Sequence, residues 1–374
     1  MTAPIQFIDL QAQRRRLGDK LERSIMDAVR GGQWVMGPQV RELEKRLSEF
    51  VGVKHTIACA NGTDALLIVL RAWEIGPGDA VFVPTFTFAA SAEVVALVGA
   101  SPVFVDVLED TYNMDPASLE AAIAMVKREG SLKPRAVMPV DLFGQTADYR
   151  VIEPICKREG LKMLCDAAQG FGALLDGRRA GGIGDAASTS FFPAKPLGCY
   201  GDGGATFTND DALAEILRSI RVHGQGSDKY ENVRIGVNSR LDTIQAAILL
   251  EKLSAFPQEI ELREAVARRY NEAFRASNRI VAPRVIDGGQ STWAQYTIQV
   301  PDRAKLQADL KAKGVPTAVY YPIPLSAQKG YKHFPSAPTP VSDRICKTVI
   351  SLPMHSDLDG ATQDRIIEAV LAAV

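Results

Sequence analysis

The sequence predicts an α/β protein with a large, mostly parallel sheet that helices cover on both faces, followed by a smaller α+β unit. Three observations lead to this prediction. Short continuous apolar runs alternate with amphipathic stretches up to about residue 208, the pattern changes after that point, and a chain of 374 residues exceeds one ordinary core. We therefore expect a large α/β domain at 1–237, which includes an N-terminal helical arm, and a small C-terminal α+β domain at 238–374.

In the first part of the chain each apolar run is a predicted strand, and the amphipathic stretch after it is a predicted helix. The strands are expected at 55–60, 80–86, 102–107, 135–140 and 162–167, and the helices at 64–73, 89–99, 116–130 and 148–160. In the second part, two long helices are expected near 239–253 and 258–276. They are followed by a strand at 294–300, a helix at 303–314, a strand at 316–321 and a terminal helix at 361–373.

Composition and charge exclude several classes of protein. The formal net charge is -1 and no long basic run is present, so neither nucleic acid nor an anionic membrane surface is an expected partner. The N-terminus lacks the apolar core of a signal peptide, and no apolar stretch has the length that spans a bilayer. The five scattered cysteines are typical of reduced thiols in a cytoplasmic protein, and the four dispersed histidines indicate no metal site.

Unusual polar residues follow several of the predicted strands, at the edge of the sheet where such folds carry their chemistry. After the first strand come Asn61-Gly62-Thr63-Asp64 and then a helix. A glycine and a hydroxyl at a helix N-terminus leave backbone N–H groups free to bind a phosphate. The alternative interpretation is a simple N-cap by Thr63 or Asp64.

Four more residues complete the pattern. Phe88 follows the second strand and could stack on a flat ligand, although core packing is the alternative. Asp166 ends a strand that is apolar on both faces, so it needs a cation, either a basic side chain or a protonated ligand nitrogen. Ser190 and Lys195 lie at the end of "ASTSFFPAK", where Lys195 follows the short apolar run Phe191-Phe192-Pro193 and precedes a segment crowded with glycine. A lysine for a Schiff base, an acid for a pyridinium nitrogen, an aromatic and a phosphate-binding helix N-terminus together indicate a pyridoxal 5'-phosphate site.

Five segments carry a closer resemblance. "ANGTDAL", "PTFTFAA", "CDAAQGFGA", "SFFPAKPLGCYGDGGA" and "GVNSRLD" resemble the signature segments of the DegT/DnrJ/EryC1/StrS family. The resemblance runs from "FIDLQAQ" near the start to "SLPMH" near the end. It implies a fold-type-I, aspartate aminotransferase-like enzyme that uses pyridoxal phosphate to aminate nucleotide-linked keto sugars. Within the family, "PLGCYGDGGA", "VRIGVNSRLDTIQAAIL" and "GVPTAVYYPIPL" are most similar to the enzymes that aminate UDP-2-acetamido-2-deoxy-3-oxo-glucuronate at C3 for bacterial surface polysaccharides.

The resemblance also implies roles for individual residues. Lys195 would bind the cofactor covalently and act as acid and base, and Asp166 would pair with the pyridinium nitrogen. L-glutamate would donate the amino group, and two subunits would form a homodimer with shared active sites. Gln169 would hydrogen-bond near the cofactor's phenolic oxygen, Gly62, Thr63 and Ser190 would bind its phosphate, and Phe88 would stack on its ring. Asn238 would reach the phosphate of the neighbouring subunit, Arg240 would bind the substrate diphosphate, and Tyr320 and Tyr321 would lie near the sugar. His223 is either a substrate contact or a structural loop residue.

Several alternatives remain open. Within the same enzyme class, the substrate could instead be UDP-3-oxo-N-acetylglucosamine, a dTDP-linked 3-oxo-6-deoxyhexose or a 4-oxo nucleotide sugar. A deoxygenating dehydratase of the same fold would carry histidine in place of Lys195, so that lysine argues against it. A non-catalytic regulatory protein would have no need of the combination of Lys195, Asp166, Gln169 and Ser190. A nicotinamide-dependent oxidoreductase is disfavoured because no predicted strand is followed by GxGxxG.

Overall fold

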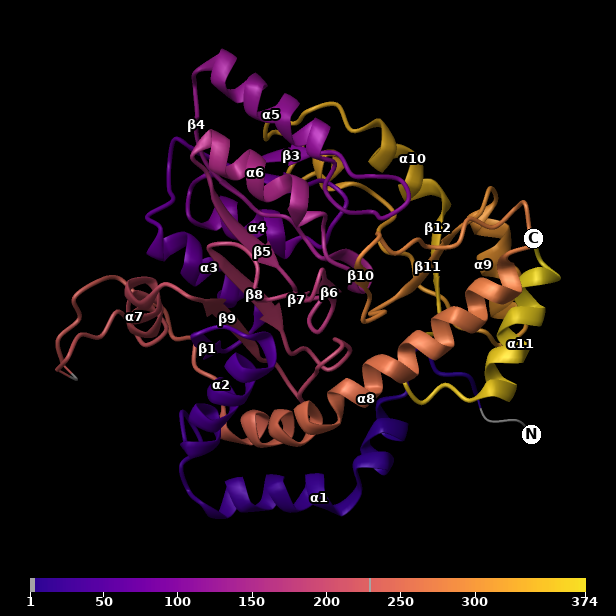
Figure 1. The fold of residues 1–374 in the computed structure, drawn as a ribbon, viewed down its shortest axis with the longest axis horizontal. Helices are drawn as coiled ribbons and strands as arrows, with labels where there is room; N and C mark the ends of the chain where they lie inside the picture. The colour runs from indigo at the N-terminus through magenta and orange to yellow at the C-terminus, as the bar shows by residue number, and fades with distance from the viewer. Residues whose placement is uncertain (1–3, 229) are drawn as a thin grey trace.

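A computed structural model describes residues 4–228 and 230–374 of the chain (Figure 1). Its main feature is a seven-stranded sheet with the order β1-β9-β8-β5-β4-β2-β3. Only β9 runs antiparallel to its neighbours β1 and β8, while the other pairs in the sheet are parallel, so the predicted mostly parallel sheet is confirmed. The strands are β1 (His55–Cys59), β2 (Asp79–Pro84), β3 (Ser101–Val105), β4 (Lys133–Val137), β5 (Lys162–Asp166), β8 (Ala186–Ser190) and β9 (Gly204–Thr208).

The direction of β9 shows which strands of the sheet run parallel to one another, and so where their carboxyl ends lie. Because β9 is antiparallel to both β1 and β8, these two strands run in the same direction as each other and as β5, β4, β2 and β3. The carboxyl ends of β1, β2, β5 and β8 therefore meet at one edge of the sheet. The polar residues that follow these strands in the sequence are brought to that edge.

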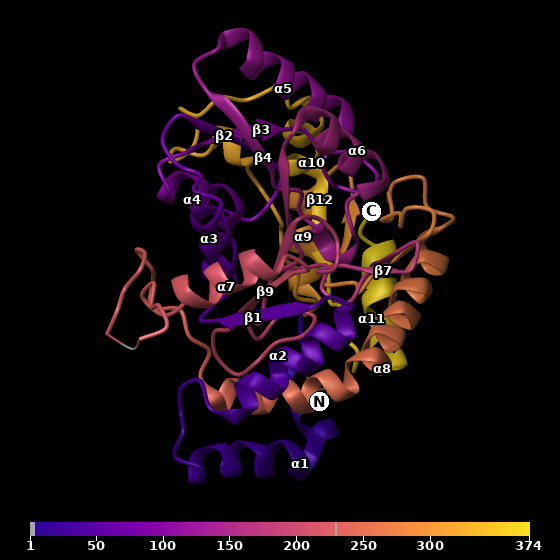
Figure 2. The same ribbon diagram turned by 60° about the vertical axis from the view of Figure 1, so that its left-hand side comes forward.

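Helices cover both faces of the sheet (Figure 2). The alternate side chains of β2 pack with different sets of these helices. Ala80 and Phe82 pack with one set of helices, whereas Val81 and Val83 pack with the other. Since both faces are buried, the strand is a continuous apolar run. The first set consists of α2 (Pro38–Val51), α5 (Pro116–Glu129), α6 (Tyr149–Glu159) and the beginning of α8 (Thr243–Phe274). The second set consists of α3 (Gly62–Ala72), α4 (Ala90–Leu97) and α7 (Asp211–Ile220).

The long helix α8 corrects one expectation. Two helices were expected near 239–253 and 258–276, but the structure has a single helix of 32 residues that continues through Pro257. Its first half packs into the core of the main sheet through residues such as Leu249 and Phe256, and its second half packs into a second core through residues such as Tyr270 and Phe274. Burial on both sides of the proline therefore overrides the local preference for a break. The domain division expected at 237/238 falls shortly before this shared helix.

The second core lies around a small antiparallel sheet near the C-terminus. Its strands are β11 (Tyr296–Gln299) and β12 (Val349–Leu352), and the helices α9 (Arg303–Ala312) and α11 (Gly360–Leu371) pack with them. The helix α10 (Pro340–Thr348) precedes β12, and its Ile345 and Cys346 pack in a separate cluster with Phe86 and other residues. The strand expected at 316–321 is wrong, because only Ala318 forms a bridge, to Ser351. Tyr320 and Tyr321 instead line a cavity beside the main sheet, and β12 supplies the second strand.

The remaining elements are short or peripheral. The N-terminal arm α1 (Leu10–Arg30) lies along α8 and changes direction at Gly18, whose φ of 62° lies in the left-handed region (Figure 1).

Within the described residues, no helix is both long and apolar enough to cross a membrane, and no group of three or more His, Cys, Asp or Glu residues could hold a metal ion. A three-stranded sheet is formed by β6 (Leu174–Leu175), β7 (Arg178–Arg179) and β10 (Gly289–Gln290), and 3-10 turns lie at Leu142–Gly144 and Leu325–Ala327.

Candidate active site

A cavity of about 860 Å³ lies at the carboxyl edge of the main sheet. It is lined by residues that are far apart in the sequence, and nine of the residues singled out above are among them. The structure therefore brings together the residues that follow β1, β2, β5 and β8 with the two tyrosines that precede α10. These nine are Gly62, Thr63, Phe88, Asp166, Gln169, Ser190, Lys195, Tyr320 and Tyr321.

The N-terminus of α3 forms one end of the cavity. Asn61 is the N-cap, and its side-chain oxygen accepts a hydrogen bond of 2.8 Å from the backbone N–H of Asp64. The capping residue is thus Asn61 and not Thr63 or Asp64. The first backbone N–H groups of a helix have no acceptor within the helix, so those of Gly62 and Thr63 are available to an anion in the cavity.

Close packing explains the glycines at this end of the cavity. A Cβ atom on Gly62 would lie 2.5 Å from Cβ of Ser190, and a Cβ on Gly204 would lie 2.4 Å from the carbonyl oxygen of Asn61. The start of α3 is therefore pressed against the ends of β8 and β9 at a separation that only glycine permits. This approach places the Ser190 hydroxyl beside the helix N-terminus, as a phosphate site requires.

Lys195 lies in the segment that connects β8 to β9 and projects into the cavity. Its backbone N–H donates a hydrogen bond of 2.8 Å to the carbonyl of Phe192, which closes a turn after the strand. Burial lowers the pKa of the Lys195 amine, and the negative charge of Asp166 partly opposes this shift. A lysine with a lowered pKa has more of its amine in the neutral, nucleophilic form than a solvent-exposed lysine has.

Asp166 ends β5 and is 95% buried, with 5% of its surface exposed. One carboxylate oxygen accepts a hydrogen bond of 2.9 Å from the hydroxyl of Ser91, and the other accepts one of 3.1 Å from the backbone N–H of Ala168. Burial raises the pKa of Asp166, while these hydrogen bonds and the charge of Lys195 act in the opposite direction. A cation held in the cavity would stabilise the ionised carboxylate.

Ser91 contacts the Asp166 carboxylate directly, and the sequence reasoning missed it. It is fully buried at the start of α4, and its hydroxyl lies 3.3 Å from that of Thr87, one turn earlier. The spacing of four residues between Thr87 and Ser91 could have indicated two hydroxyls on one helix face. Their position over the end of β5 could not be read from one sequence.

The exposure of Phe88 distinguishes between its two interpretations, stacking on a flat ligand and packing in the core. It is 56% exposed although it lines the cavity, so it does not fill the core as the alternative interpretation proposed. A large aromatic face left open to a cavity is suited to stack on a planar ligand. Phe192, which is 52% exposed, lines the same cavity and is a second aromatic that the sequence reasoning did not select.

Gln169 has a defined orientation in the cavity wall. Its side-chain oxygen accepts a hydrogen bond of 2.9 Å from the backbone N–H of Phe143, and its side-chain nitrogen donates one of 3.1 Å to the hydroxyl of Tyr321. Burial raises the pKa of Tyr321, so this phenol stays protonated. The pair links the large sheet to the segment before α10 and fixes Tyr321 at the cavity.

Three residues selected from the sequence do not line this cavity. His223, Asn238 and Arg240 belong to the segment that connects α7 to α8, part of which protrudes from the body of the molecule (Figure 1). His223 and Asn238 are exposed. Nε of Arg240 is buried and has no hydrogen-bond partner among the described residues. In one copy of the chain these three side chains therefore do not complete the cavity that holds Lys195.

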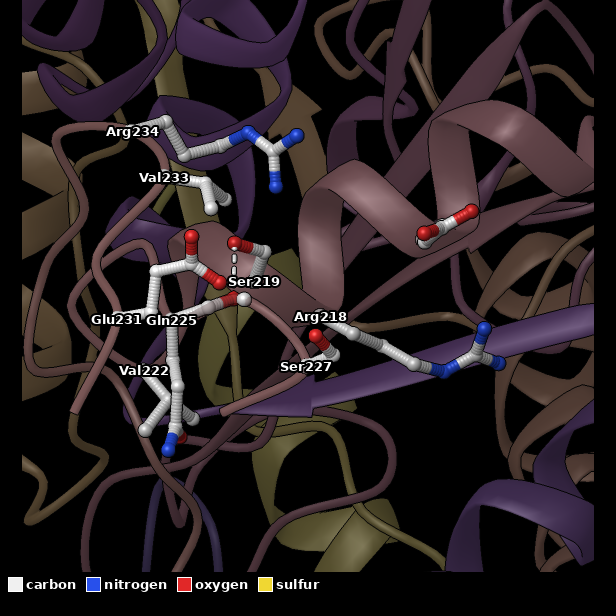
Figure 3. Close-up of a pocket in the computed structure, with 10 residues that line it drawn as sticks. Arg218, Ser219, Val222, Gln225, Ser227, Glu231, Val233 and Arg234 are labelled. Carbon is white, nitrogen blue, oxygen red and sulfur yellow. Dashed lines mark hydrogen bonds between the residues drawn. The ribbon is translucent and has the colours of Figure 1, made fainter. Parts of the chain in front are cut away.

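A second cavity of about 480 Å³ lies between α7 and the protruding segment (Figure 3). Ser219 closes one side, where its hydroxyl donates a hydrogen bond of 2.7 Å to the carbonyl of Gln225. The charged residues around it are Glu215, Arg218, Glu231 and Arg234. None of the residues selected from the sequence lines this cavity, so the candidate active site is the larger one.

The charge of the larger cavity is unusual for a site that is expected to bind anions. Among the residues that the structure describes, its lining includes three aspartates, Asp64, Asp166 and Asp202, but only one lysine or arginine, Lys195. The cavity is also lined by Asn61 and by residues that the sequence reasoning missed, which come from loops, from α3 and α4, and from the segment just before β11. The missed residues are Ile8, Leu66, Thr87, Ala90, Val140, Ala168, Phe192, Ala194, Asp202 and Gln295.

Comparison with known proteins adds independent findings. Residues 16–371 match the model of the DegT/DnrJ/EryC1/StrS aminotransferase family. The chain is 50% identical to the UDP-2-acetamido-2-deoxy-3-oxo-D-glucuronate aminotransferase of Pseudomonas aeruginosa over 98% of this chain and 99% of that protein. Its structure is similar to the crystal structure of a DegT DnrJ EryC1 StrS aminotransferase from Brucella abortus, with a TM-score of 0.97, 54% identity and coverage of 98% and 99% of the two chains. It is also similar to NtdA from Bacillus subtilis with bound cofactor PMP, with a TM-score of 0.91, 28% identity and coverage of 100% and 86%.

Proposed function

This chain belongs to the DegT/DnrJ/EryC1/StrS aminotransferase family, and from that premise we propose its cofactor, substrate and assembly. The cofactor is pyridoxal 5'-phosphate, held at Lys195. The reaction moves an amino group from L-glutamate to C3 of UDP-2-acetamido-2-deoxy-3-oxo-glucuronate, for the synthesis of bacterial surface polysaccharide. The observation that carries the proposal is the shared cavity of Lys195, Asp166 and the N-terminus of α3.

The residues present fit this cofactor. The α3 N-terminus and the Ser190 hydroxyl supply donors for a phosphate, in a space that the missing Cβ of Gly62 leaves open. Asp166 is buried with hydrogen bonds only from neutral groups, so a protonated ring nitrogen would give it a counter-charge. Phe88 presents its exposed aromatic face to the same cavity.

The chemistry then follows from the positions of the side chains. When bound, the cofactor supplies an electron sink that stabilises negative charge at the substrate carbon next to the amine. Lys195 supplies the amine that binds the cofactor, and burial lowers the pKa of this amine, which favours the neutral form that can take the proton from that carbon. Asp166 holds the proton on the ring nitrogen, and Ser91 orients the Asp166 carboxylate. Tyr321, oriented by Gln169, forms part of the wall on the substrate side.

The choice of sugar is supported by the relative from Pseudomonas aeruginosa, which matches this chain over nearly its whole length at 50% identity. The test is a panel of nucleotide sugars with purified, pyridoxal phosphate-loaded enzyme and L-glutamate. We expect 2-oxoglutarate and a 3-amino product, identified by mass and NMR, with the highest kcat/KM for the 3-oxo-glucuronate. The competing substrates are UDP-3-oxo-N-acetylglucosamine, a dTDP-linked 3-oxo-6-deoxyhexose and a 4-oxo nucleotide sugar. A preference for one of these would overturn the choice of substrate, and no 2-oxoglutarate with any of them would overturn the activity.

The charge of the cavity supports a homodimer with shared active sites. The proposed ligands are a phosphate, a diphosphate and carboxylates, yet within residues 4–228 and 230–374 of one chain the cavity is lined by three aspartates and a single lysine or arginine. Cations from a second copy would balance this charge. Arg240, with its unpartnered Nε, and the exposed Asn238 and His223 lie on the protruding segment and are the residues we assign to the partner's cavity.

Mixed dimers test this assignment. Lys195→Ala and Asn238→Glu should each inactivate a homodimer, the second because its carboxylate repels the phosphate. When the two variants are unfolded and refolded together in equal amounts, about half of the dimers are mixed. One site of each mixed dimer carries both changes and the other carries neither, so activity should return to about a quarter of that of the unmodified enzyme. If mixed dimers are demonstrated by mass and no activity returns, Asn238 acts within its own chain.

A further inference from the structure

The segment between β8 and β9, residues 191–203, is held in place by an unusually dense set of contacts. Its two ends are joined by a hydrogen bond of 2.7 Å from the Phe191 N–H to the Gly203 carbonyl. Within the segment, the Cys199 N–H donates a hydrogen bond of 2.8 Å to the Phe191 carbonyl. A Cβ atom on Gly198 would lie 2.5 Å from the carbonyl oxygen of Pro193. The loop therefore folds back on itself with Lys195 at its turn, and its position depends on what its far side contacts.

That far side is bound by α8. Gln245 accepts a hydrogen bond of 2.9 Å from the Tyr200 N–H through its side-chain oxygen, and its nitrogen donates one of 3.4 Å to the Tyr200 carbonyl. Two turns further along the helix, Nζ of Lys252 donates a hydrogen bond of 2.7 Å to the carbonyl of Gly198. The same Nζ lies 4.4 Å from the centre of the Tyr200 ring, close enough for a cation–π contact.

Burying the amine of Lys252 at this place in the fold costs free energy of folding. Only 1% of its surface is exposed, and burial lowers its pKa to about 8. No ion pair among residues 4–228 and 230–374 includes it. The charge of the Glu259 carboxylate acts on Lys252, but this carboxylate is hydrogen-bonded to Gln13 and Arg16 of α1. A methionine would fill the same volume on this helix without burying an amine.

We propose that Lys252 is a positioning residue for Lys195, which it holds at the cavity by anchoring the Gly198 carbonyl and the Tyr200 ring to α8. This proposal rests on the proposed function, because Lys195 is taken to be the residue that binds the cofactor. Lys252 touches neither the cavity lining nor the proposed substrates. It acts through the loop, and the geometry of the loop sets the direction in which the Lys195 amine points.

The test is Lys252→Met, which keeps the length of the side chain and removes the donor. We expect the variant to fold, and the amides of residues 197–203 to exchange with deuterium about tenfold faster than in the unmodified chain, because the loop has lost its anchor. The kcat of transamination should fall about tenfold to a hundredfold with KM for L-glutamate nearly unchanged, since a misplaced amine slows the chemical step and not the binding step. Covalent capture of added pyridoxal phosphate by the cofactor-free chain, followed by absorbance, should slow in the same variant.

The matched control is Lys20→Met. Lys20 is an exposed lysine of α1 that pairs with Glu251 of α8 at 2.7 Å, so this change removes a charge beside the same helix without touching the loop. Exchange and capture rates should stay as in the unmodified chain. If Lys252→Met does not fold, Gln245→Leu removes the neighbouring contacts of the loop and must give the same loss of amide protection and of capture rate.

Two outcomes would overturn the proposal. Unchanged exchange of residues 197–203 would show that Lys252 does not anchor the loop, and faster exchange with an unchanged capture rate would show that the anchor does not position Lys195. Failure of the proposed function has a different signature. In that case the unmodified enzyme produces no 2-oxoglutarate, while the exchange and capture measurements still report on Lys252.

Discussion

Lys195→Ala is expected to abolish transamination while the chain remains folded and still binds pyridoxal phosphate without a covalent bond. The contacts at the α3 N-terminus, Ser190 and Phe88 do not involve the Lys195 side chain, so the phosphate and ring should still be held. Loss of one acid–base group typically costs about 10²–10⁴-fold, and the loss of the covalent attachment adds to this. Production of 2-oxoglutarate measures the rate. Mass analysis of the borohydride-reduced protein should show cofactor attached at residue 195 only in the unmodified enzyme.

Lys195→Arg is the informative companion, since it keeps a positive charge next to Asp166 but cannot form the covalent bond. It should be as inactive as the alanine variant. Near-normal transamination by either variant would contradict the whole assignment of this site.

The same residue predicts the direction of the pH dependence. Burial lowers the pKa of Lys195, so the neutral amine becomes available at a lower pH than in a solvent-exposed lysine. The rate of proton removal should therefore rise with pH through this lowered pKa and level off above it. A kcat that falls with pH over that range would show that the neutral amine is not the base.

Asp166→Asn should have the second-largest effect on catalysis. It should lower the activity but raise the stability of the cofactor-free chain. The amide keeps the shape of the side chain but removes the counter-charge for a protonated ring nitrogen, so activity should fall roughly 10²–10³-fold. Ser91→Ala removes only the hydroxyl that donates to the carboxylate and should give a smaller loss. Similar activity in Asp166→Asn and the unmodified enzyme would show that no charge is needed at this position.

The effect on stability follows from the raised pKa of Asp166. A folded-state pKa above the unfolded value means that the folded chain binds this proton more tightly. The stabilisation is complete below the unfolded pKa and is lost as pH rises through the raised pKa. At neutral pH the buried carboxylate thus destabilises the cofactor-free chain, and Asp166→Asn should raise its melting temperature. A lower melting temperature without cofactor would mean that the carboxylate is already compensated by the protein.

The part of the site that could be predicted from the sequence is the part built on parallel strands. Lys195, Asp166, Gly62 and Phe88 each follow an apolar run, and the rule that the ends of parallel strands meet at one edge places them together. Ser91 was not predicted because one sequence does not show that its hydroxyl lies over the end of β5 and contacts Asp166. Gln295 was not predicted because no local pattern shows that the segment before β11 comes to this edge.

Tertiary packing accounts for the errors in the second part of the chain. Pro257 is a local signal to end a helix, but Phe256 and Ile260 beside it are both buried in the main core, and that burial outweighs the proline. The apolar run at 316–321 has the composition of a strand, but its two tyrosines are drawn to the cavity. The roles of Asn238 and Arg240 are implied by the family resemblance, whereas His223 is either a substrate contact or a structural loop residue. The place of all three in a partner's cavity stays a prediction.

The continuity of α8 also limits how this protein can be divided and recombined. A fragment that ends at residue 237 would leave an open apolar groove where Leu249, Leu253 and Phe256 insert into the core of the main sheet. A fragment that begins at Thr243 would carry those same side chains into water. Because the single helix α8 packs into both cores, the two cores should unfold on heating in a single cooperative transition. A chimera that exchanges the C-terminal half with a relative must therefore match two packing surfaces along one helix.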